Sequence, residues 1–219
     1  MSSSNTDSAS IQQKLLQNPK IAKLKNAITQ RVLHLMQEGI PTKIADLTEQ
    51  FQLAPLSTSS HLSSLQAAAL ATASDPGKVL EQIVNSLRDK AFELLDDATL
   101  LVTWIKLNMP KIADGNNFGV EIQLEIVKEL QTAAQLAACI LRNVTNYFEK
   151  RAQLVSKSRK HPDIPDYARV IHNLDENNVT YCRRDYTDIR DRYALLFDII
   201  SKNWEKICKP RTENTGQFY

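Results

Sequence analysis

Apolar side chains recur every three or four residues along four stretches of the chain, the spacing that places them on one face of an α-helix. The first stretch begins after Pro19, and its apolar positions are Ile21, Leu24, Ile28, Val32 and Leu35. Gly39 and Pro41 follow in the order typical of a helix C-terminus, so we expect this helix to end there. A shorter apolar pattern over residues 42–51 predicts a few further helical turns.

Three longer amphipathic stretches follow, and proline-containing segments separate them. We expect helices over about 78–108, from about 120 to the HPDIP segment at 161–165, and from about 166 to Pro210. Helices of about 30 to 40 residues are about 45–60 Å long, and short links between them make neighbours antiparallel. The predicted fold is therefore all-α, an elongated up-down four-helix bundle.

Two segments lack this periodicity. Residues 1–18, which begin MSSSNTDSAS, predict a disordered N-terminal tail, and the Ser-, Thr- and Ala-rich residues 54–76 predict a flexible insert. The length of the chain suits one core, so residues 19–219 are predicted to form one domain.

Small residues in the third long helix would let a neighbouring helix approach closely, and wide apolar faces favour oligomers. These residues are Ala133, Ala134, Ala137 and Ala138.

Composition narrows the function classes. With 27 Lys and Arg against 25 Asp and Glu, the chain lacks the positive field of a general nucleic-acid binder. No window has the length of apolar sequence that a membrane span needs, and the Ser-rich N-terminus does not resemble a secretory signal. Cys139, Cys182 and Cys208 are widely spaced and odd in number, which predicts reduced thiols inside the cell.

The residues of an enzyme site are missing from the sequence. No Glu stands three residues before any of the four histidines, so the two-metal carboxylate site of helical bundles is not expected. Gly77-Lys78 lacks the other residues of a phosphate loop. Acid pairs such as Asp96-Asp97 and Asp175-Glu176 are predicted to lie on solvated helix faces. The mixed charges between Arg183 and Arg192 predict an exposed, ion-paired face or a subunit contact. We expect no cofactor, no metal and no catalysis.

The link between the second and third long helices is unusually rich in residues for special backbone. Gly115, Asn116, Asn117 and Gly119 tolerate positive φ, and Asp114 can fix a turn. These types predict either a rigid, shaped loop or an ordinary helix hairpin. The chain ends in a polar segment, 211–219, whose last two residues are aromatic. A terminal carboxylate beside aromatic rings can dock in a groove, although frayed ends are also common.

Both segments resemble the 11S (REG-type) proteasome activators. Residues 110–123 (PKIADGNNFGVEIQ) are similar to the family's activation loop and the start of its third helix, and Lys209-Pro-Arg followed by eight residues to a terminal Tyr is similar to its C-terminal segment. RAQLVSK at 151–157 and YALLFDII at 193–200 continue the resemblance, which covers about 104–219 and is nearest the gamma-type branch. Residues 54–76 lack the Lys/Glu tract and the basic cluster of some branches.

The resemblance implies a heptameric ring that docks on the 20S proteasome α-ring, opens its entrance without ATP and stimulates peptide hydrolysis. The implied activation-loop residues are Lys111, Asp114, Gly115, Asn116, Asn117, Phe118 and Gly119, and the implied docking residues are Gln217, Phe218 and Tyr219. It also implies self-association as a homoheptamer and a location in the nucleus and cytoplasm, with the nucleus favoured by the gamma-type wording. The alternatives are a structural coiled-coil or adaptor oligomer and, less favoured, an enzyme or cofactor bundle.

Overall fold

The computed structural model describes residue 15 and residues 17–53, 78–111 and 117–211. Within these segments the chain is helical and has no β-strand, so the all-α prediction is confirmed. No helix among them has the length and apolarity to cross a bilayer. The predicted insert at 54–76, and the predicted tail at 1–18 apart from residues 15, 17 and 18, lie outside the described residues. The helices, in order, are α2 (Pro19–His34), η1 (Leu35–Gly39), α3 (Ile40–Leu53), α5 (Lys78–Leu107), α6 (Phe118–Lys160), α7 (Asp166–Lys202) and α8 (Trp204–Cys208).

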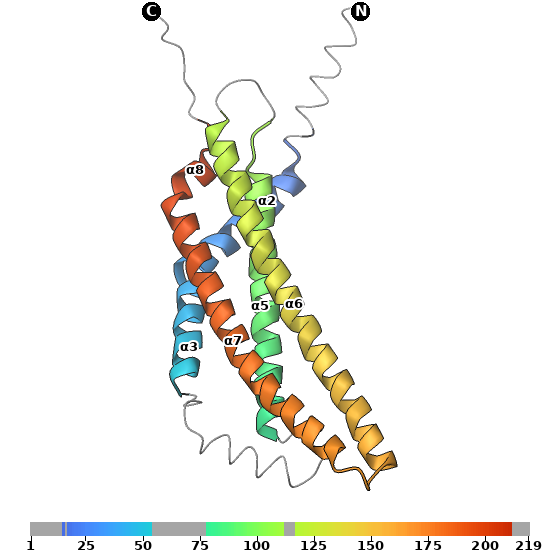
Figure 1. Ribbon diagram of the computed structural model, residues 1–219. Helices are drawn as coiled ribbons and strands as arrows, with labels where there is room; N and C mark the ends of the chain where they lie inside the picture. Colours follow the sequence, from blue (N-terminus) through green and yellow to red (C-terminus); the bar gives the residue numbers. More distant parts are fainter. Residues whose placement is uncertain (1–14, 16, 54–77, 112–116, 212–219) are drawn as a thin grey trace, which may run out of the picture.

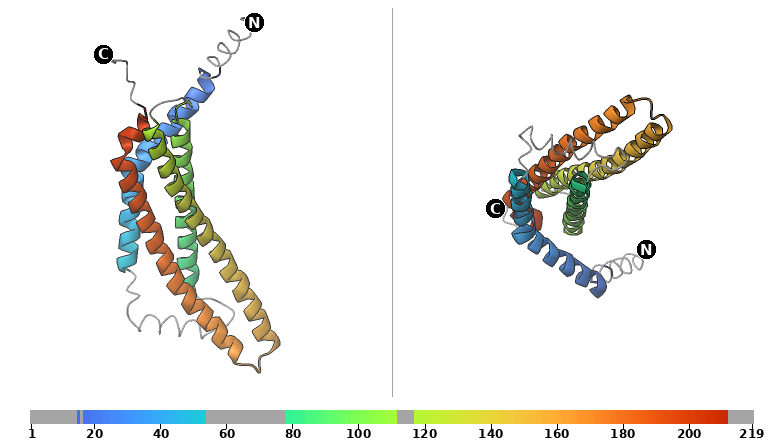
Figure 2. Two further views of the ribbon diagram at one scale, coloured as in Figure 1. Left: turned by 45° about the horizontal axis from the view of Figure 1, so that its top comes forward. Right: turned by 90° about the horizontal axis from the view of Figure 1, so that it is seen from below.

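Helices α3, α5, α6 and α7 alternate in direction along the long axis of the molecule (Figure 1). Helix α5 packs along α6, α6 along α7, and α3 against α7. Helix α2 crosses the bundle at the end where α5 stops and α6 begins (Figure 2). Helix α6 has 43 residues, which gives it a length of about 65 Å. The predicted elongated up-down bundle is therefore confirmed.

Small and branched side chains fill the centre of the bundle. Ala133 and Ala137 have no exposed surface, as expected for residues that let a neighbouring helix approach closely. The apolar residues of α5 and α7 with the lowest exposure recur at helical spacing, which confirms the predicted buried stripes. On α5 these are Val84, Leu87, Ala91, Leu94, Ala98, Leu101 and Ile105, and on α7 they are Ile189, Tyr193, Leu196 and Ile200.

Gly39 and Pro41 do not end the first helix, and that prediction was wrong. The backbone passes from α2 through the π-helical turn η1 into α3, with the N–H of Ile40 donating to the carbonyl of Leu35, five residues earlier. Pro41 has no N–H to donate, and its ring crowds the carbonyl of the preceding turn. A wider π turn directly before the proline accommodates both effects and changes the direction of the helix. As a result α2 lies across the bundle and α3 along it (Figures 1 and 2).

The fourth long helix ends before Pro210, contrary to the expectation. Helix α7 stops at Lys202, and Asn203 separates it from the short α8. The Asn203 side chain donates to the carbonyl of Ile199 at 2.8 Å. This break redirects α8, whose Ile207 is fully buried, towards the first turns of α6.

Asp175, predicted to lie on a solvated face, is buried instead. Its carboxylate accepts a hydrogen bond from the Tyr147 hydroxyl at 2.8 Å. Arg151 of α6 donates from Nε at 3.0 Å and 3.2 Å to the two carboxylate oxygens, and from Nη2 at 3.1 Å. Burial and the nearby carboxylate raise the pKa of Tyr147 well above its usual value, so its hydroxyl stays a donor. The acid is therefore satisfied by two residues of the neighbouring helix.

Asp97 is likewise turned inward, whereas Asp96 is exposed as predicted. Asp97 accepts a hydrogen bond from the Tyr193 hydroxyl of α7 at 2.7 Å and pairs with the Lys43 ammonium of α3. The Lys43 Nζ also lies 5.6 Å from the centre of the Tyr193 ring. One carboxylate thus links three helices of the bundle.

Candidate functional site

The flanks of the predicted loop and the beginning of the predicted tail lie at one end of the bundle (Figure 1). Helices α5 and α7 are parallel, so their C-terminal ends meet beside the start of α6. The antiparallel order of neighbouring helices, which the sequence predicted, therefore brings the described part of each segment to one end of the bundle. Of the site residues, Lys111, Asn117, Phe118 and Gly119 are described; Asp114, Gly115, Asn116, Gln217, Phe218 and Tyr219 lie outside the described residues.

Arg211, at the start of the tail, is hydrogen-bonded to both flanks of the loop. Its Nη1 donates to the backbone carbonyl of Lys111 at 3.1 Å, and its Nη2 donates to Oδ1 of Asn117 at 2.8 Å. Asn117 precedes α6, and its side chain makes no hydrogen bond that caps the helix. The helix start is instead secured by the Asn117 carbonyl, which accepts from the N–H groups of Val120 and Glu121. The Asn117 side chain therefore acts as a hydrogen-bond acceptor for Arg211 and not as a helix cap.

Gly119 is required by a close approach of two backbones. A Cβ added at Gly119 would lie 2.0 Å from the carbonyl oxygen of Pro210 and 2.6 Å from its Cα. Gly119 does not use the positive φ that its residue type tolerates, because the residue lies in the first turn of α6. What this position needs is the absence of a side chain.

One turn further along α6, a buried hydrogen bond joins this helix to α8. Gln123 of α6 has no exposed surface, and its Nε2 donates to the carbonyl of Ile207 in α8 at 2.8 Å. Carbonyls in the last turn of a helix lack partners within the helix, so this side chain supplies one. The first turns of α6 are thereby fixed against α8 and the residues that follow it.

Two tryptophans hold α8 to the end of α5. The rings of Trp104 and Trp204 are stacked, with centroids 5.1 Å apart and planes inclined by 22°. Trp104 is buried, and stacked aromatic pairs contribute about 0.5–1.5 kcal/mol beyond the burial of their area. Together with Gln123, this stack fixes the position from which the tail leaves the bundle.

Phe118 lies at the same end, and it is 61% exposed although its side chain is large and apolar. The sequence indicated this residue only as part of the loop. Sequence reasoning did not predict the contacts of Arg211, Gln123 and the tryptophan pair, because the residues that they contact lie 84 to 100 positions away in the chain. Gly119 within a helix start was the available signal, because a glycine there often marks a close backbone approach.

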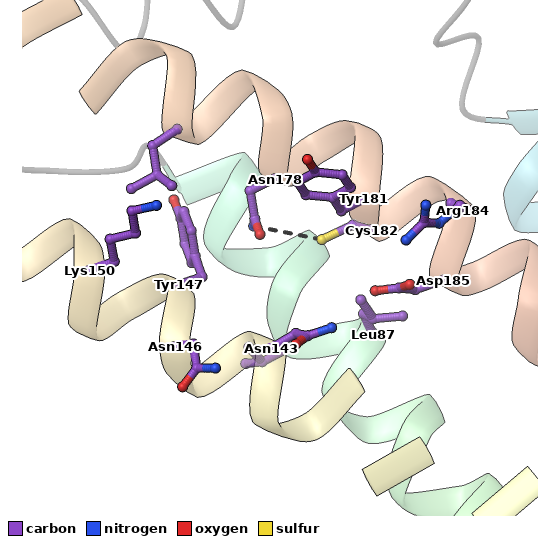
Figure 3. Close-up of a pocket in the computed structure, with 12 residues that line it drawn as sticks. Leu87, Asn143, Asn146, Tyr147, Lys150, Asn178, Tyr181, Cys182, Arg184 and Asp185 are labelled. Carbon is purple, nitrogen blue, oxygen red and sulfur yellow. Dashed lines mark hydrogen bonds between the residues drawn. The ribbon is translucent and has the colours of Figure 1, made fainter. Parts of the chain in front are cut away.

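A separate pocket of about 390 Å³ lies between α5, α6 and α7 (Figure 3). Its α6 residues, 143–150, belong to the half of that helix away from the loop. Its lining includes Cys182, Asn178 and Asp185. Burial raises the pKa of the Cys182 thiol to about 12, so the thiolate needed for nucleophilic chemistry is disfavoured. Burial also raises the pKa of Asp185 to about 6. Asp185 is thus a buried member of the run of charges that was predicted to form an exposed, ion-paired face or a subunit contact.

Comparison with known proteins identifies the family. The family described as proteasome activator PA28, C-terminal, matches residues 74–217. The chain belongs to this family. Proteasome activator complex subunit 3 of Homo sapiens is 38% identical over 140 residues, which cover 64% of this chain and 55% of the relative, and the subunit of Gallus gallus gives the same values. The chain therefore matches little more than half the length of these curated relatives. They are gamma-type subunits, in agreement with the resemblance found in the sequence.

Solved structures of the same fold extend the comparison to most of the chain. The 11S subunit PA28 of the Plasmodium falciparum proteasome superposes with a TM-score of 0.73 at 27% identity, covering 89% of this chain and 94% of that one. The activator PA26 of Trypanosoma brucei, solved in complex with the yeast 20S proteasome, gives a TM-score of 0.62 at 14% identity and covers 90% and 97%. At 14% identity, the match to PA26 shows only a shared fold.

Proposed function

We propose that this protein is an ATP-independent activator that docks on the 20S proteasome, opens its entrance and stimulates peptide hydrolysis. The observation that carries the proposal is the junction of Arg211 with both flanks of the loop. Through it, the segment proposed to dock and the segment proposed to open the gate start from one end of one bundle. Such an arrangement lets both segments meet the same surface at once.

The relatives support the same function. The curated relatives are named as subunits of a proteasome activator complex, and the fold recurs in an activator solved on a 20S proteasome. Among the described residues, no group of three or more His, Cys, Asp or Glu is placed to hold a metal ion. In this proposal the protein regulates an enzyme and performs no catalysis itself.

The ring is the second part of the proposal. Ile21 and Leu24 of α2 have the spacing of a buried helix face, but they are 48% and 52% exposed in the single chain. We propose that neighbouring copies cover this face in a homoheptamer, with residues 19–219 of each copy acting as one domain. Seven tails on one ring raise the effective concentration for one another, so weak individual contacts give firm docking.

Opening of the entrance then follows from differential binding. The loop between Lys111 and Gly119 is proposed to contact the entrance of the proteasome in its open state better than in its closed state. A partner that binds one of two states more tightly shifts the population towards that state without any nucleotide. We further propose that the protein acts in the nucleus and cytoplasm, which the gamma-type resemblance favours.

Two measurements test the proposal against a structural coiled-coil or adaptor oligomer. Light scattering should give about 170 kDa for a ring of seven 24.8 kDa chains, whereas a dimer or trimer would be far smaller. Co-sedimentation with purified 20S proteasome should then show binding that disappears when residues 217–219 are deleted. A deleted variant that keeps its size and still binds would refute the docking assignment. A wild-type protein that never binds would refute the proposed function.

A further inference from the structure

Arg211 is placed where the two proposed working segments meet, one residue before the tail passes beyond the described residues. Its guanidinium reaches acceptors on both sides of the segment 112–116, the Lys111 carbonyl and the Asn117 side chain. These acceptors are 100 and 94 positions away from Arg211 in the chain. One side chain therefore closes the base of the loop and joins that base to the start of the tail.

The backbone that carries Arg211 is itself fixed on several sides. Pro210 lies so close to Gly119 that no Cβ fits between them. The carbonyl of Ile207 accepts the buried hydrogen bond from Gln123. These contacts hold residues 207–210 against the first turns of α6. The Arg211 side chain is therefore preorganised near its acceptors, and it loses less conformational freedom when it binds them.

The type of side chain suits the task. Arginine presents several N–H donors in a planar fork, so two acceptors held at a fixed separation can bind it at once. The three N–H donors of lysine radiate from one nitrogen on a flexible chain, so they do not reproduce the fixed spacing of the two arginine nitrogens. The observed bonds use Nη1 for one flank and Nη2 for the other, as this geometry requires.

Fixing the base of a loop restricts its conformations, since both ends of the connecting residues are then held in place. The described start of the tail is bonded to both described flanks of the loop through Arg211. We propose that Arg211 is a positioning residue that couples docking of the tail to placement of the loop on the proteasome surface. This inference rests on the proposed function and adds that docking and gate opening communicate through one guanidinium.

The test uses the full-length protein with Arg211→Ala, and Arg88→Ala as a matched control. Arg88 is also paired to an acid, Asp89, but lies on α5 far along the chain from this end. Peptide hydrolysis by 20S proteasome is measured at rising activator concentrations, which separates the half-saturating concentration from the maximal rate. For Arg211→Ala we expect docking at the wild-type concentration and a maximal stimulation lowered by about threefold or more, because the placed loop is less populated.

A second measurement needs no proteasome. Hydrogen exchange of the amides at 112–116 in the isolated assembly should be faster in Arg211→Ala than in wild type or Arg88→Ala, with the unfolding temperature and the light-scattering mass unchanged. Arg211→Lys should resemble Arg211→Ala in both measurements. Asn117→Ala removes one of the two acceptors, so combining it with Arg211→Ala should add little to the effect of Arg211→Ala alone.

The outcomes separate this inference from the proposed function. If wild type stimulates and Arg211→Ala stimulates equally well with unchanged loop exchange, the coupling is refuted and the proposed function survives. A raised half-saturating concentration at full maximal rate would also refute it, since Arg211 would then contact the proteasome directly. Loss of the assembly in Arg211→Ala would assign the residue to ring formation instead. Absence of any stimulation by wild type would remove the proposed function itself.

Discussion

Asp175→Asn should destabilise the bundle strongly, although the two side chains have nearly the same shape. Asp175 and Arg151 are each only 6% exposed, and the arginine donates to both carboxylate oxygens within 3.2 Å. The substitution removes the negative charge and leaves the guanidinium buried as an uncompensated cation. Removing one member of a buried ion pair costs about 3–5 kcal/mol. We expect a loss near 3 kcal/mol, because the Asn oxygen can still accept one of the bonds.

The cost should come from the unpaired charge more than from the lost attraction. A variant that also replaces the arginine and the third member of the cluster, Asp175→Leu with Arg151→Met and Tyr147→Phe, removes every polar group at once. Apolar replacements of buried ion pairs are often close to neutral, so this variant should lie within about 2 kcal/mol of wild type. The triple variant should therefore be more stable than the single one.

Urea unfolding at pH 7 and one fixed protein concentration measures both free energies, since assembly makes the apparent stability depend on concentration. Asp191→Asn is the control, because this acid pairs with Arg190 at 2.7 Å with 55% of its own side chain exposed. Exposed pairs contribute about 0–1 kcal/mol. A loss below about 1 kcal/mol for Asp175→Asn, or a triple variant less stable than the single one, would refute the argument from buried charge.

Three further substitutions test other parts of the structure. Gly119→Ala must displace Pro210, because the carbonyl oxygen of Pro210 lies 2.0 Å from the new Cβ. Thermal unfolding should therefore show a loss of about 1–3 kcal/mol in stability, and peptide-hydrolysis assays should show a loss of stimulation. Normal stimulation by this variant would contradict the close-approach argument. Tyr193→Phe removes the donor to Asp97 and should cost about 1–2 kcal/mol in urea unfolding, and no loss would show that the bond is replaced. Asp185 has a pKa raised from 3.8 to about 6, so the folded state binds its proton more tightly and ionisation between about pH 4 and 6 destabilises it. Asp185→Asn should thus add up to about 3 kcal/mol at pH 7, and a gain that persists at pH 4 would contradict this assignment.

The buried stripes and most helix ends followed from local sequence. The stretches that flank Pro110 and the HPDIP segment became α5, α6 and α7 within two residues of the expected bounds at those breaks. Helical spacing and missing backbone donors are local properties, so a single sequence contains them. The antiparallel order of neighbouring helices was predicted as well, and this order places the loop and tail flanks at one end of the bundle.

The errors arose where the outcome depends on distant partners. Gly39 and Pro41 looked like a stop signal, but a π turn accommodated the proline within a continuing helix. Asp97 and Asp175 looked like surface acids because sequence spacing does not reveal a tyrosine and a cation on another helix. The contacts of Arg211 were missed for the same reason, since both acceptors lie about a hundred positions away.

The most direct test of the account is the rate at which purified 20S proteasome hydrolyses a short fluorogenic peptide, without ATP, as this protein is added. The account predicts a saturable rise in rate with wild type and none with the variant lacking residues 217–219. It also predicts that Gly115→Tyr, which alters the loop and leaves the tail intact, competes with wild type for docking but does not stimulate. An unchanged rate with correctly assembled wild-type protein, or full stimulation by Gly115→Tyr, would contradict the account.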